Sequence, residues 1–311
     1  MIGAAALGSE RGNETVRLVY PQWQGGDIAR WLPEIPDAAE AARGYLLGAQ
    51  VLDFVVPPGE QRTLVVPVAT ERRERRVTEG VLDLDEIEEQ TGAALRLLEE
   101  ANPRRVVTVG GECSVSVVPF TFLASRYEGD VAMVWIDAHP DITLPGDVYA
   151  GYHAMAAAAC LGLGHERIIR QLPGRIEREN VLFVGLRDWE REEIRERQKA
   201  LGLKHLSPED VRSRPEALRE WLRGCNATKV VVHLDLDVLD PEEIIAAVGV
   251  SPDGMRMGEV VEAIRAVAEE KELVGLTVAE YMPRTLIRIR DMLTQIPLIG
   301  SQQKVRHDDE L

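Results

Sequence analysis

Short runs of apolar and β-branched residues alternate with longer segments of helical periodicity along most of the chain. Such alternation is typical of a mostly parallel sheet whose strands are connected by helices. Several runs are apolar at almost every position, which indicates strands that helices cover on both faces. The predicted strands span residues 16–20, 51–56, 64–67, 106–109, 131–136, 181–184, 229–236 and 273–278.

The segments between these strands repeat their apolar residues with the period of an amphipathic helix. The predicted helices span residues 84–101, 117–127, 189–201, 215–224 and 257–271. The chain contains no internal repeat and no long linker rich in proline and glycine that would separate domains. We therefore predict one three-layer α-β-α domain over residues 1–311, with a mostly parallel central sheet and a polar tail at residues 300–311.

The charge and the cysteine content of the chain indicate where the protein is located and which partners it binds. The 311-residue chain has 36 Lys and Arg against 52 Asp and Glu, which gives a formal net charge of −16. This balance argues against a nucleic-acid partner, because phosphate contacts need a basic surface. The negative net charge suits a cationic small substrate.

Three scattered cysteines indicate a reducing compartment. No apolar run approaches the roughly 20 residues of a membrane helix, and no signal peptide is recognisable, so we predict a cytoplasmic protein without membrane contact.

Two acidic clusters stand at the ends of predicted strands, with their members at alternate positions. The first comprises Asp137, His139 and Asp141, and the second comprises His233, Asp235 and Asp237. Alternate residues of an extended chain point to the same side. One such cluster would indicate no more than a strand that runs into an acidic turn. Two clusters of carboxylate and imidazole predict a metal site, because these ligands suit Mn, Zn or Fe and a dication removes the repulsion between carboxylates.

Two further predicted strands are followed by residues that could take part in catalysis or binding. Gly110 and Gly111 follow a predicted strand and permit a tight turn ahead of Cys113. This turn has three functional interpretations, namely a phosphate-binding loop, a thiol nucleophile at a helix N-terminus, and a thiolate metal ligand. A buried and inert cysteine is the ordinary alternative. Glu280 follows the last predicted strand, where it fits a surface loop as well as a functional site.

Taken in order, these four segments resemble the ureohydrolase family of arginase and agmatinase. The family's Asp-Ala-His-x-Asp motif stands at 137–141, and its Ser-x-Asp-x-Asp-x-x-Asp-Pro motif stands at 233–241. Its Gly-Gly-x-His-Ser motif stands at 110–114, and its late strand-end glutamate is Glu280. The resemblance covers residues 106–283 and implies an arginase-like α/β fold.

The resemblance also implies a binuclear manganese centre. One metal would be held by Cys113, Asp137, Asp141 and Asp235, and the other by Asp137, His139, Asp235 and Asp237, with Asp137 and Asp235 bridging. Two residues depart from the family pattern, since Cys113 replaces a histidine and His233 replaces a serine. Thiolate is a softer ligand than imidazole, so two Mn²⁺ are implied but another divalent metal is open.

Family members hydrolyse guanidino groups to urea and an amine, and the resemblance implies roles for three residues. Asp141 would orient the nucleophilic water, and Glu280 would pair with the planar guanidinium. His153 lies close to where arginases carry a histidine that shuttles protons, so it would move the proton or contact the substrate. A histidine without chemistry is the alternative for His153.

The choice of substrate depends on three further positions. Asp188 and Glu190 lie in a segment that resembles the arginase residues around the substrate α-amino group, whereas Thr143 stands where arginases have Asn. The resemblance therefore implies an amidinohydrolase for arginine or Nω-hydroxy-arginine, assembled as a trimer or hexamer. The alternatives are an agmatinase, a hydrolase of another guanidino or formimino acid, and a degenerate member that binds metal without turnover.

Overall fold

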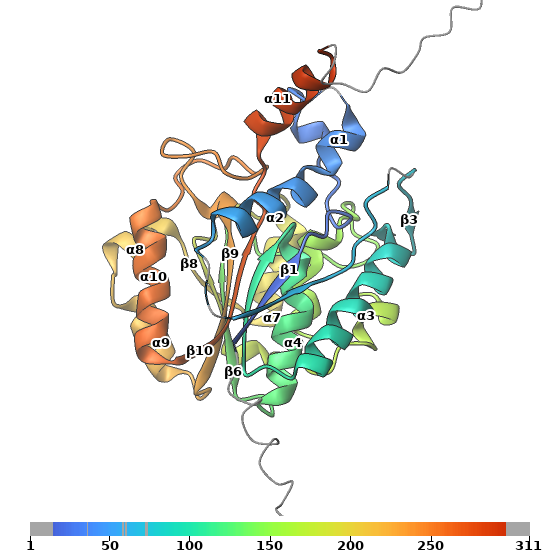
Figure 1. The fold of residues 1–311 in the computed structure, drawn as a ribbon. Coiled ribbons are helices and arrows are strands. Elements are labelled where there is room, and N and C mark those ends of the chain that lie inside the picture. Colours follow the sequence, from blue (N-terminus) through green and yellow to red (C-terminus); the bar gives the residue numbers. More distant parts are fainter. Residues whose placement is uncertain (1–14, 36, 58, 60, 72–73, 297–311) are drawn as a thin grey trace, which may run out of the picture.

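The computed structural model describes residues 15–35, 37–57, 59, 61–71 and 74–296, arranged around a parallel sheet (Figure 1). Its eight strands lie in the order β2-β1-β5-β10-β9-β6-β7-β8, and each neighbouring pair is parallel. β10, the last strand among the described residues, thus lies between β5 and β9. The strands are β1 (Thr15–Tyr20), β2 (Arg62–Val65), β5 (Arg105–Gly110), β6 (Val131–Ile136), β7 (Val181–Val184), β8 (Lys204–Leu206), β9 (Lys229–Asp235) and β10 (Glu272–Ala279).

Helices cover both faces of this sheet, with α9 and α10 on one side and α3 and α4 on the other (Figure 1). Neighbouring residues of a strand accordingly enter different cores. Trp135 of β6 packs in the core beneath α3 and α4, whereas Val134 packs in the core beneath α9 and α10. This arrangement confirms the predicted three-layer α-β-α fold. The helices are α1 (Ala38–Ala42), α2 (Gly44–Val55), α3 (Leu84–Ala101), α4 (Val117–Arg126), α5 (Ala156–Cys160), α6 (Glu166–Ile169), α7 (Glu192–Leu201), α8 (Pro208–Ser213), α9 (Ala217–Gly224), α10 (Met257–Glu270) and α11 (Arg284–Thr294).

Seven of the predicted strands are confirmed, and β6 and β7 have the predicted bounds. The strand predicted at residues 51–56 is wrong, because this segment forms the end of α2. The buried residues of α2 recur at helical spacing from Gly44 to Leu52, while Phe54 is 88% exposed. The segment therefore buries one helical stripe rather than two strand faces.

The five predicted helices are also confirmed, with small shifts at their ends. α3 has the predicted bounds, whereas α7 begins at Glu192 instead of residue 189. Glu190 has a φ of 58°, and Arg191 before the helix is extended, so the backbone enters α7 late. The structure adds elements that the pattern did not predict, including β8 and the fully buried α5. A helix buried on every side shows no amphipathic period.

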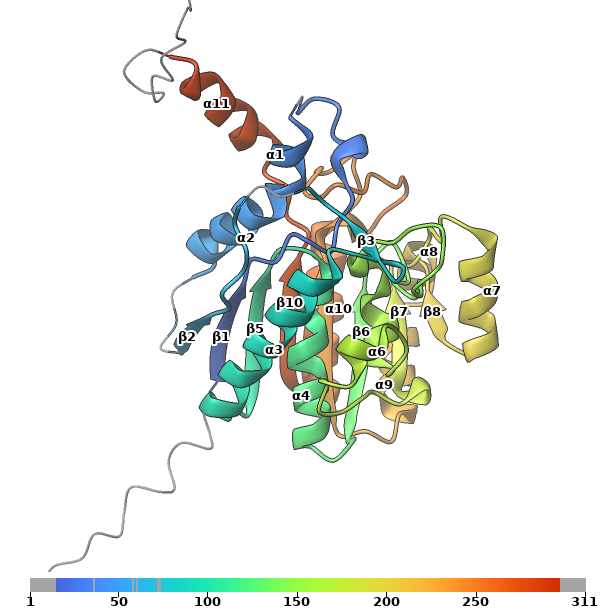
Figure 2. The ribbon, with the colours of Figure 1, turned by 90° about the vertical axis from the view of Figure 1, so that its right-hand side faces the viewer.

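A small hairpin, β3 (Val77–Thr78) and β4 (Val81–Leu82), precedes α3. Its two turn residues, Glu79 and Gly80, both have positive φ, as a two-residue hairpin turn requires. Figure 2 shows this hairpin at the same end of the molecule as α1 and α11. The polar tail predicted at 300–311 lies outside the described residues, and the single-domain organisation of the whole chain stays a prediction. Among the helices that the structure describes, none combines the length and apolar character needed to cross a membrane.

Candidate metal centre

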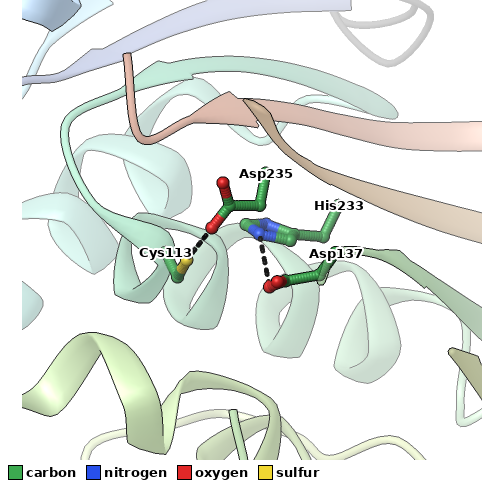
Figure 3. Close-up of side chains that lie close together, drawn as sticks. All are labelled: Cys113, Asp137, His233 and Asp235. Carbon is green, nitrogen blue, oxygen red and sulfur yellow. Dashed lines mark hydrogen bonds and ion pairs between the residues drawn. The ribbon is translucent and has the colours of Figure 1, made fainter. Parts of the chain in front are cut away.

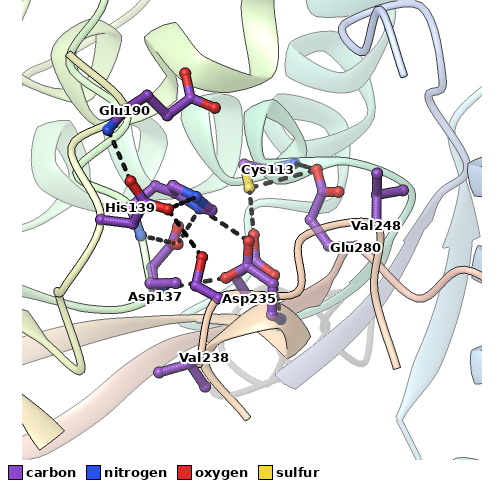
Figure 4. A network of polar contacts seen from close by, with 12 residues as sticks. Cys113, Asp137, His139, Glu190, Asp235, Val238, Val248 and Glu280 are labelled. Carbon is purple, nitrogen blue, oxygen red and sulfur yellow. Dashed lines mark hydrogen bonds and ion pairs between the residues drawn. The ribbon is translucent and has the colours of Figure 1, made fainter. Parts of the chain in front are cut away.

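Four adjacent strands in the middle of the sheet end at one edge and carry the candidate residues. Cys113 begins the 3-10 helix η3 (Cys113–Ser116) after β5, Asp137 follows β6, Asp235 ends β9, and Glu280 follows β10. Because these strands are neighbours in the order β5-β10-β9-β6, residues far apart in sequence converge, as expected at the carboxyl ends of parallel strands. Figure 4 shows these side chains gathered around one point.

The turn after β5 depends on a glycine for its shape, and its backbone donates a hydrogen bond to a carboxylate. A Cβ at Gly111 would lie 1.8 Å from the Gln22 carbonyl oxygen, so this close approach needs glycine. The turn aims the Cys113 backbone N–H at Glu280 Oε1, to which it donates over 3.1 Å. A phosphate would meet negative charge here, which argues against the phosphate-binding interpretation of this segment.

The Cys113 thiol is buried among acids. Its Sγ lies 3.1 Å from Asp235 Oδ2 and 3.5 Å from Glu280 Oε1. Burial, followed by the charges of Asp141, Asp235 and Glu280, raises the pKa of the Cys113 thiol well above its ordinary value. Without a cation beside it, Cys113 is therefore a protonated donor to these carboxylates, which argues against the interpretation as a low-pKa nucleophile.

Cys113 belongs to a first group of possible metal ligands, drawn in Figure 3. One ligand atom from each of Cys113, Asp137, His233 and Asp235 lies within 4.8 Å of the other three, and all four residues are buried. Three of these four are ligands that the family resemblance implies for one metal. His233 is the fourth residue, in place of Asp141.

A second group joins Asp137, His139 and Asp237 within the same distance. His139 Nδ1 lies 2.9 Å from Asp237 Oδ2 and 3.6 Å from Asp137 Oδ1. Burial and then the charge of Asp237 raise the pKa of Asp137 to about 7. Burial lowers the pKa of His139, but Asp237 and Asp137 outweigh it and raise that pKa well above its ordinary value. Asp137 belongs to both groups, as a bridging ligand would.

Asp141 lies beside these groups rather than in them. It is 6% exposed, and its Oδ2 finds no hydrogen-bond partner within the part of the chain that the structure describes. Its φ of 47° is rare for a residue other than glycine, so the extended alternation of the strand has ended before this position. Burial and then the charge of Asp137 raise the pKa of Asp141 well above its usual range.

The half-buried His153 and the buried Glu280 form a pair above the centre. His153 Nδ1 lies 3.3 Å from Glu280 Oε1, and the Tyr149 hydroxyl lies 2.7 Å from the other ring nitrogen, Nε2. Burial lowers the pKa of His153, but Tyr149, Glu280 and Asp141 outweigh burial and raise it well above its ordinary value. These charges favour the protonated imidazole, whose Nδ1 lies beside the predicted guanidinium partner.

A cavity of about 660 Å³ opens over these residues. The predicted site residues that line it are Cys113, His139, Asp141, Thr143, His153, Asp188, Glu190, Asp235, Asp237 and Glu280. Asp137 does not line it and is 1% exposed. The structure therefore brings all ten lining residues into one pocket.

Besides His153 and Glu280, three residues are predicted to contact the substrate, and they differ in how free they are to bind it. The Thr143 hydroxyl donates to the Ala154 carbonyl over 2.7 Å and is engaged by the protein. Asp188 accepts hydrogen bonds from the Glu190 N–H at 2.8 Å and the Ser251 hydroxyl at 2.9 Å. Glu190 is exposed at the mouth of the pocket, and Figure 4 shows its carboxylate directed away from His139.

Sequence reasoning missed two groups of residues around the site. Tyr149, the partner of His153, shows no motif, although its spacing of four residues from His153 was a usable signal. Glu112 is fully buried, and its carboxylate accepts from Gln22 Nε2 and from the Ser114 N–H and hydroxyl, each at 2.8 Å. Gln22 lies in the first loop of the chain, and its distance in sequence left no local signal.

The residues present fit a pair of divalent cations. Asp137, Asp141, Asp235 and Glu280 are buried acids within one small region, and their mutual repulsion and burial are unfavourable without a compensating charge. Asp141 Oδ2, which has no hydrogen-bond partner among the described residues, also lacks a compensating positive charge. Carboxylates, imidazole and thiolate are all ligands of divalent transition metals.

These observations define a class of protein, namely an α/β fold with a carboxylate-rich candidate metal site at the carboxyl edge of its sheet. Residues 64–292 match the model of the arginase family. The chain belongs to the arginase family.

Curated relatives agree with this assignment, and solved structures share the fold. An arginase of Entamoeba histolytica is 27% identical over 190 residues, which are 58% of this chain and 62% of that protein. The chain spans about three fifths of the length of the curated relatives it matches. The structure of E. histolytica arginase with L-ornithine has a TM-score of 0.67 at 20% identity, over 89% of this chain and 97% of that chain. A formimidoylglutamase of Bacillus subtilis has a TM-score of 0.64 at 15% identity, over 87% and 80%.

Proposed function

We propose that this protein is a metal-dependent amidinohydrolase that releases urea from the guanidino group of an arginine-like compound. The observation that carries the proposal is one acidic pocket lined by the His153–Glu280 pair and by members of the three groups of possible ligands, of which the third joins Cys113 to that pair. A guanidinium is a planar cation whose N–H groups match a carboxylate in a bidentate way. The pocket supplies such carboxylates at its floor and its mouth.

Glu280 is the proposed partner of the guanidinium. Glu280 is 3% exposed. Its backbone N–H donates to the Gly111 carbonyl over 2.7 Å and its Oε1 accepts from the Cys113 N–H over 3.1 Å, so the residue is held at both its backbone and its carboxylate. Fixing the guanidinium in one orientation converts an encounter with water into a nearly intramolecular reaction.

Asp141 and His153 are the proposed proton carriers. The Oδ2 of Asp141 is available to orient a water molecule, and His153 holds a proton that the departing amine requires. Tyr149 keeps the His153 ring in place through its hydroxyl. Divalent cations held by Asp137, Asp235 and their neighbours would supply the Lewis acidity that makes water a nucleophile near neutral pH.

Asp188 supports an amino-acid substrate. It lies 3.9 Å from His139 at the side of the pocket, where a carboxylate could bind an α-ammonium group. A formimino acid is the second candidate, because a formimidoylglutamase shares the fold. The proposed trimer or hexamer and the cytoplasmic location stay predictions.

The test is urea release by protein reconstituted with Mn²⁺ or with Zn²⁺. Arginine, Nω-hydroxy-arginine, agmatine, guanidinobutyrate and formimidoylglutamate are offered separately, with formamide measured for the last. Turnover of one guanidino compound is expected, with a fall of about 100-fold or more in Asp141→Asn. Asp147→Asn is the matched control, since Asp147 pairs with Arg197 outside the pocket. If protein that has bound Mn²⁺ and protein that has bound Zn²⁺ both release no product from any of these compounds, the proposal is overturned.

A further inference from the structure

His233 is a buried histidine with one ring nitrogen left over. It is 0% exposed, and its Nδ1 lies 2.8 Å from the Ser116 hydroxyl. Its Nε2 has no hydrogen-bond partner among the residues from 15 to 296 that the structure describes. Buried polar atoms are normally satisfied, so a lone ring nitrogen calls for an explanation. The function proposed above does not use it.

The free nitrogen points into the first ligand group. His233 Nε2 lies 3.9 Å from Asp137 Oδ2, and the atoms of Cys113, Asp137, His233 and Asp235 lie within 4.8 Å of one another (Figure 3). Tetrahedral zinc holds S, N and O ligands at about 2.0–2.3 Å, which separates them from each other by about 3.3–3.8 Å. The four side chains therefore need only a small contraction to enclose one ion.

Neighbouring side chains hold the His233 ring in an orientation that suits a metal ligand. The ring stacks on Trp135 with centroids 3.7 Å apart and planes 15° apart. Trp135 also donates from Nε1 to Asp137 Oδ2 over 2.9 Å, so one residue orients two of the four ligands. Ser116 can accept the Nδ1–H, which leaves the lone pair on Nε2, as in histidines that bind metals in proteins.

We propose that Cys113, Asp137, His233 and Asp235 form a four-ligand site that selects Zn²⁺ over Mn²⁺, with His233 as a direct ligand. Thiolate and imidazole favour zinc, whereas Mn²⁺ favours oxygen ligands in octahedral geometry. Two carboxylates and a thiolate also supply the negative charge that a buried dication needs. Asp141 then stays outside the zinc shell and keeps its free oxygen. This inference goes beyond the proposed function and stands without turnover.

The decisive measurement is metal binding to the full chain. Protein stripped with a chelator is titrated with Zn²⁺ and with Mn²⁺ against competing chelators, and X-ray absorption at the zinc edge reports the ligands. We expect zinc to bind at least about 100-fold more tightly than manganese, with one sulfur and at least one nitrogen in its shell. His233→Ser should weaken zinc binding about tenfold or more and leave manganese binding nearly unchanged.

His165→Ser is the matched control. His165 is also a buried histidine, but it pairs with Glu79 away from the pocket, so its loss should leave both affinities unchanged. If His233→Ser does not fold, the wild-type protein still decides the question. Its Co²⁺ form should show the intense visible bands of a tetrahedral ion and a sulfur-to-cobalt charge-transfer band.

Three results would overturn the inference. They are an all-oxygen zinc shell in the wild-type protein, a preference for manganese, and unchanged zinc affinity in folded His233→Ser. Urea release is measured separately on the same preparations. A protein with the expected zinc shell and no urea release would contradict the amidinohydrolase and leave the zinc site intact.

Discussion

Asp141 and Glu280 both hold a left-handed backbone conformation, with φ values of 47° and 67°. Such conformations cost free energy in residues other than glycine and persist only where the surroundings enforce them. Here the Ala158 N–H donates to the Asp141 carbonyl over 3.1 Å, and the Glu280 N–H donates to Gly111. The backbone therefore determines where both carboxylates point before any ligand arrives.

Asp188 allows the substrate class to be tested at one residue. In Asp188 one carboxylate oxygen accepts from the Glu190 N–H and the other accepts from the Ser251 hydroxyl. Asp188→Asn keeps one of these two acceptors and removes the charge. We expect kcat/KM for an arginine-like amino acid to fall about 10- to 100-fold, because a hydrogen bond between charged groups is lost. Activity on guanidinobutyrate, which has no amino group, is measured in parallel as the comparison.

Glu196→Gln is the control for this substitution, since Glu196 lies on the exposed surface of α7 and pairs with Lys199. A uniform fall for all substrates in Asp188→Asn, or an unchanged kcat/KM for the amino acid, would remove Asp188 from substrate recognition.

The alternation of polar residues predicted only part of the candidate centre. Asp137 and His139 are close, as the spacing indicates, and Asp235 and Asp237 converge on them. Asp141 stands apart because the positive φ at this residue ends the period of two. His233 carried the right spacing, but its role depends on the contacts of Trp135 and Ser116, which no local pattern reveals.

Among the elements, α2 bears directly on the site. A Cβ at Gly48 would lie 1.8 Å from the Tyr281 carbonyl oxygen, so α2 packs against the backbone that follows Glu280. The apolar run at 51–56 was misread as a strand because its burial pattern begins earlier, at Gly44. A window of six residues, five of them apolar, does not distinguish a strand from the end of a helix.

Gly48→Ala should disturb both stability and activity. The added methyl group must displace the Tyr281 backbone and with it Glu280, so we expect a loss of about 1–3 kcal/mol in the free energy of unfolding and a lower kcat/KM. Denaturant unfolding and urea assays measure the two effects.

Gly258→Ala is the matched control, because a Cβ there meets nothing within 4 Å and the position lies in α10. It should be neutral or stabilising by up to about 1 kcal/mol. Equal effects of the two substitutions would contradict the packing role of Gly48.

At the scale of the whole molecule, the buried acids couple stability to pH and metal. A pKa of about 7 for Asp137, against an ordinary value of 3.8, means that the folded state keeps a proton that the unfolded chain releases. This contribution is complete below pH 3.8 and is lost as the pH rises through 7. His233, whose pKa burial lowers to about 3, has the opposite effect, but only between pH 3 and its ordinary value of 6.5.

Metal-free protein should therefore lose stability as the pH rises from about 6.5, where the opposing effect of His233 ends, through 7, where Asp137 loses its proton. The slope is about 1.4 kcal/mol per pH unit for each proton that the folded state retains. Metal-loaded protein should show the opposite trend, because metals compete with protons for the same ligands. Thermal unfolding at several pH values, with chelator or with zinc, measures both slopes.

Asp137→Asn should flatten the slope of the metal-free protein, since it removes one of the titrating groups. Identical slopes with and without metal would mean that protons and metals do not share these ligands.

The position of β10 also determines when the sheet and the site can be completed during synthesis of the chain. Without it, β2, β1 and β5 form one set of adjacent strands, and β9, β6, β7 and β8 form another. During synthesis both sets emerge from the ribosome before residue 272, where β10 begins. The last strand then joins the two halves and delivers Glu280 to Cys113, 167 residues away. A nascent chain therefore has no complete site until its final strand has inserted.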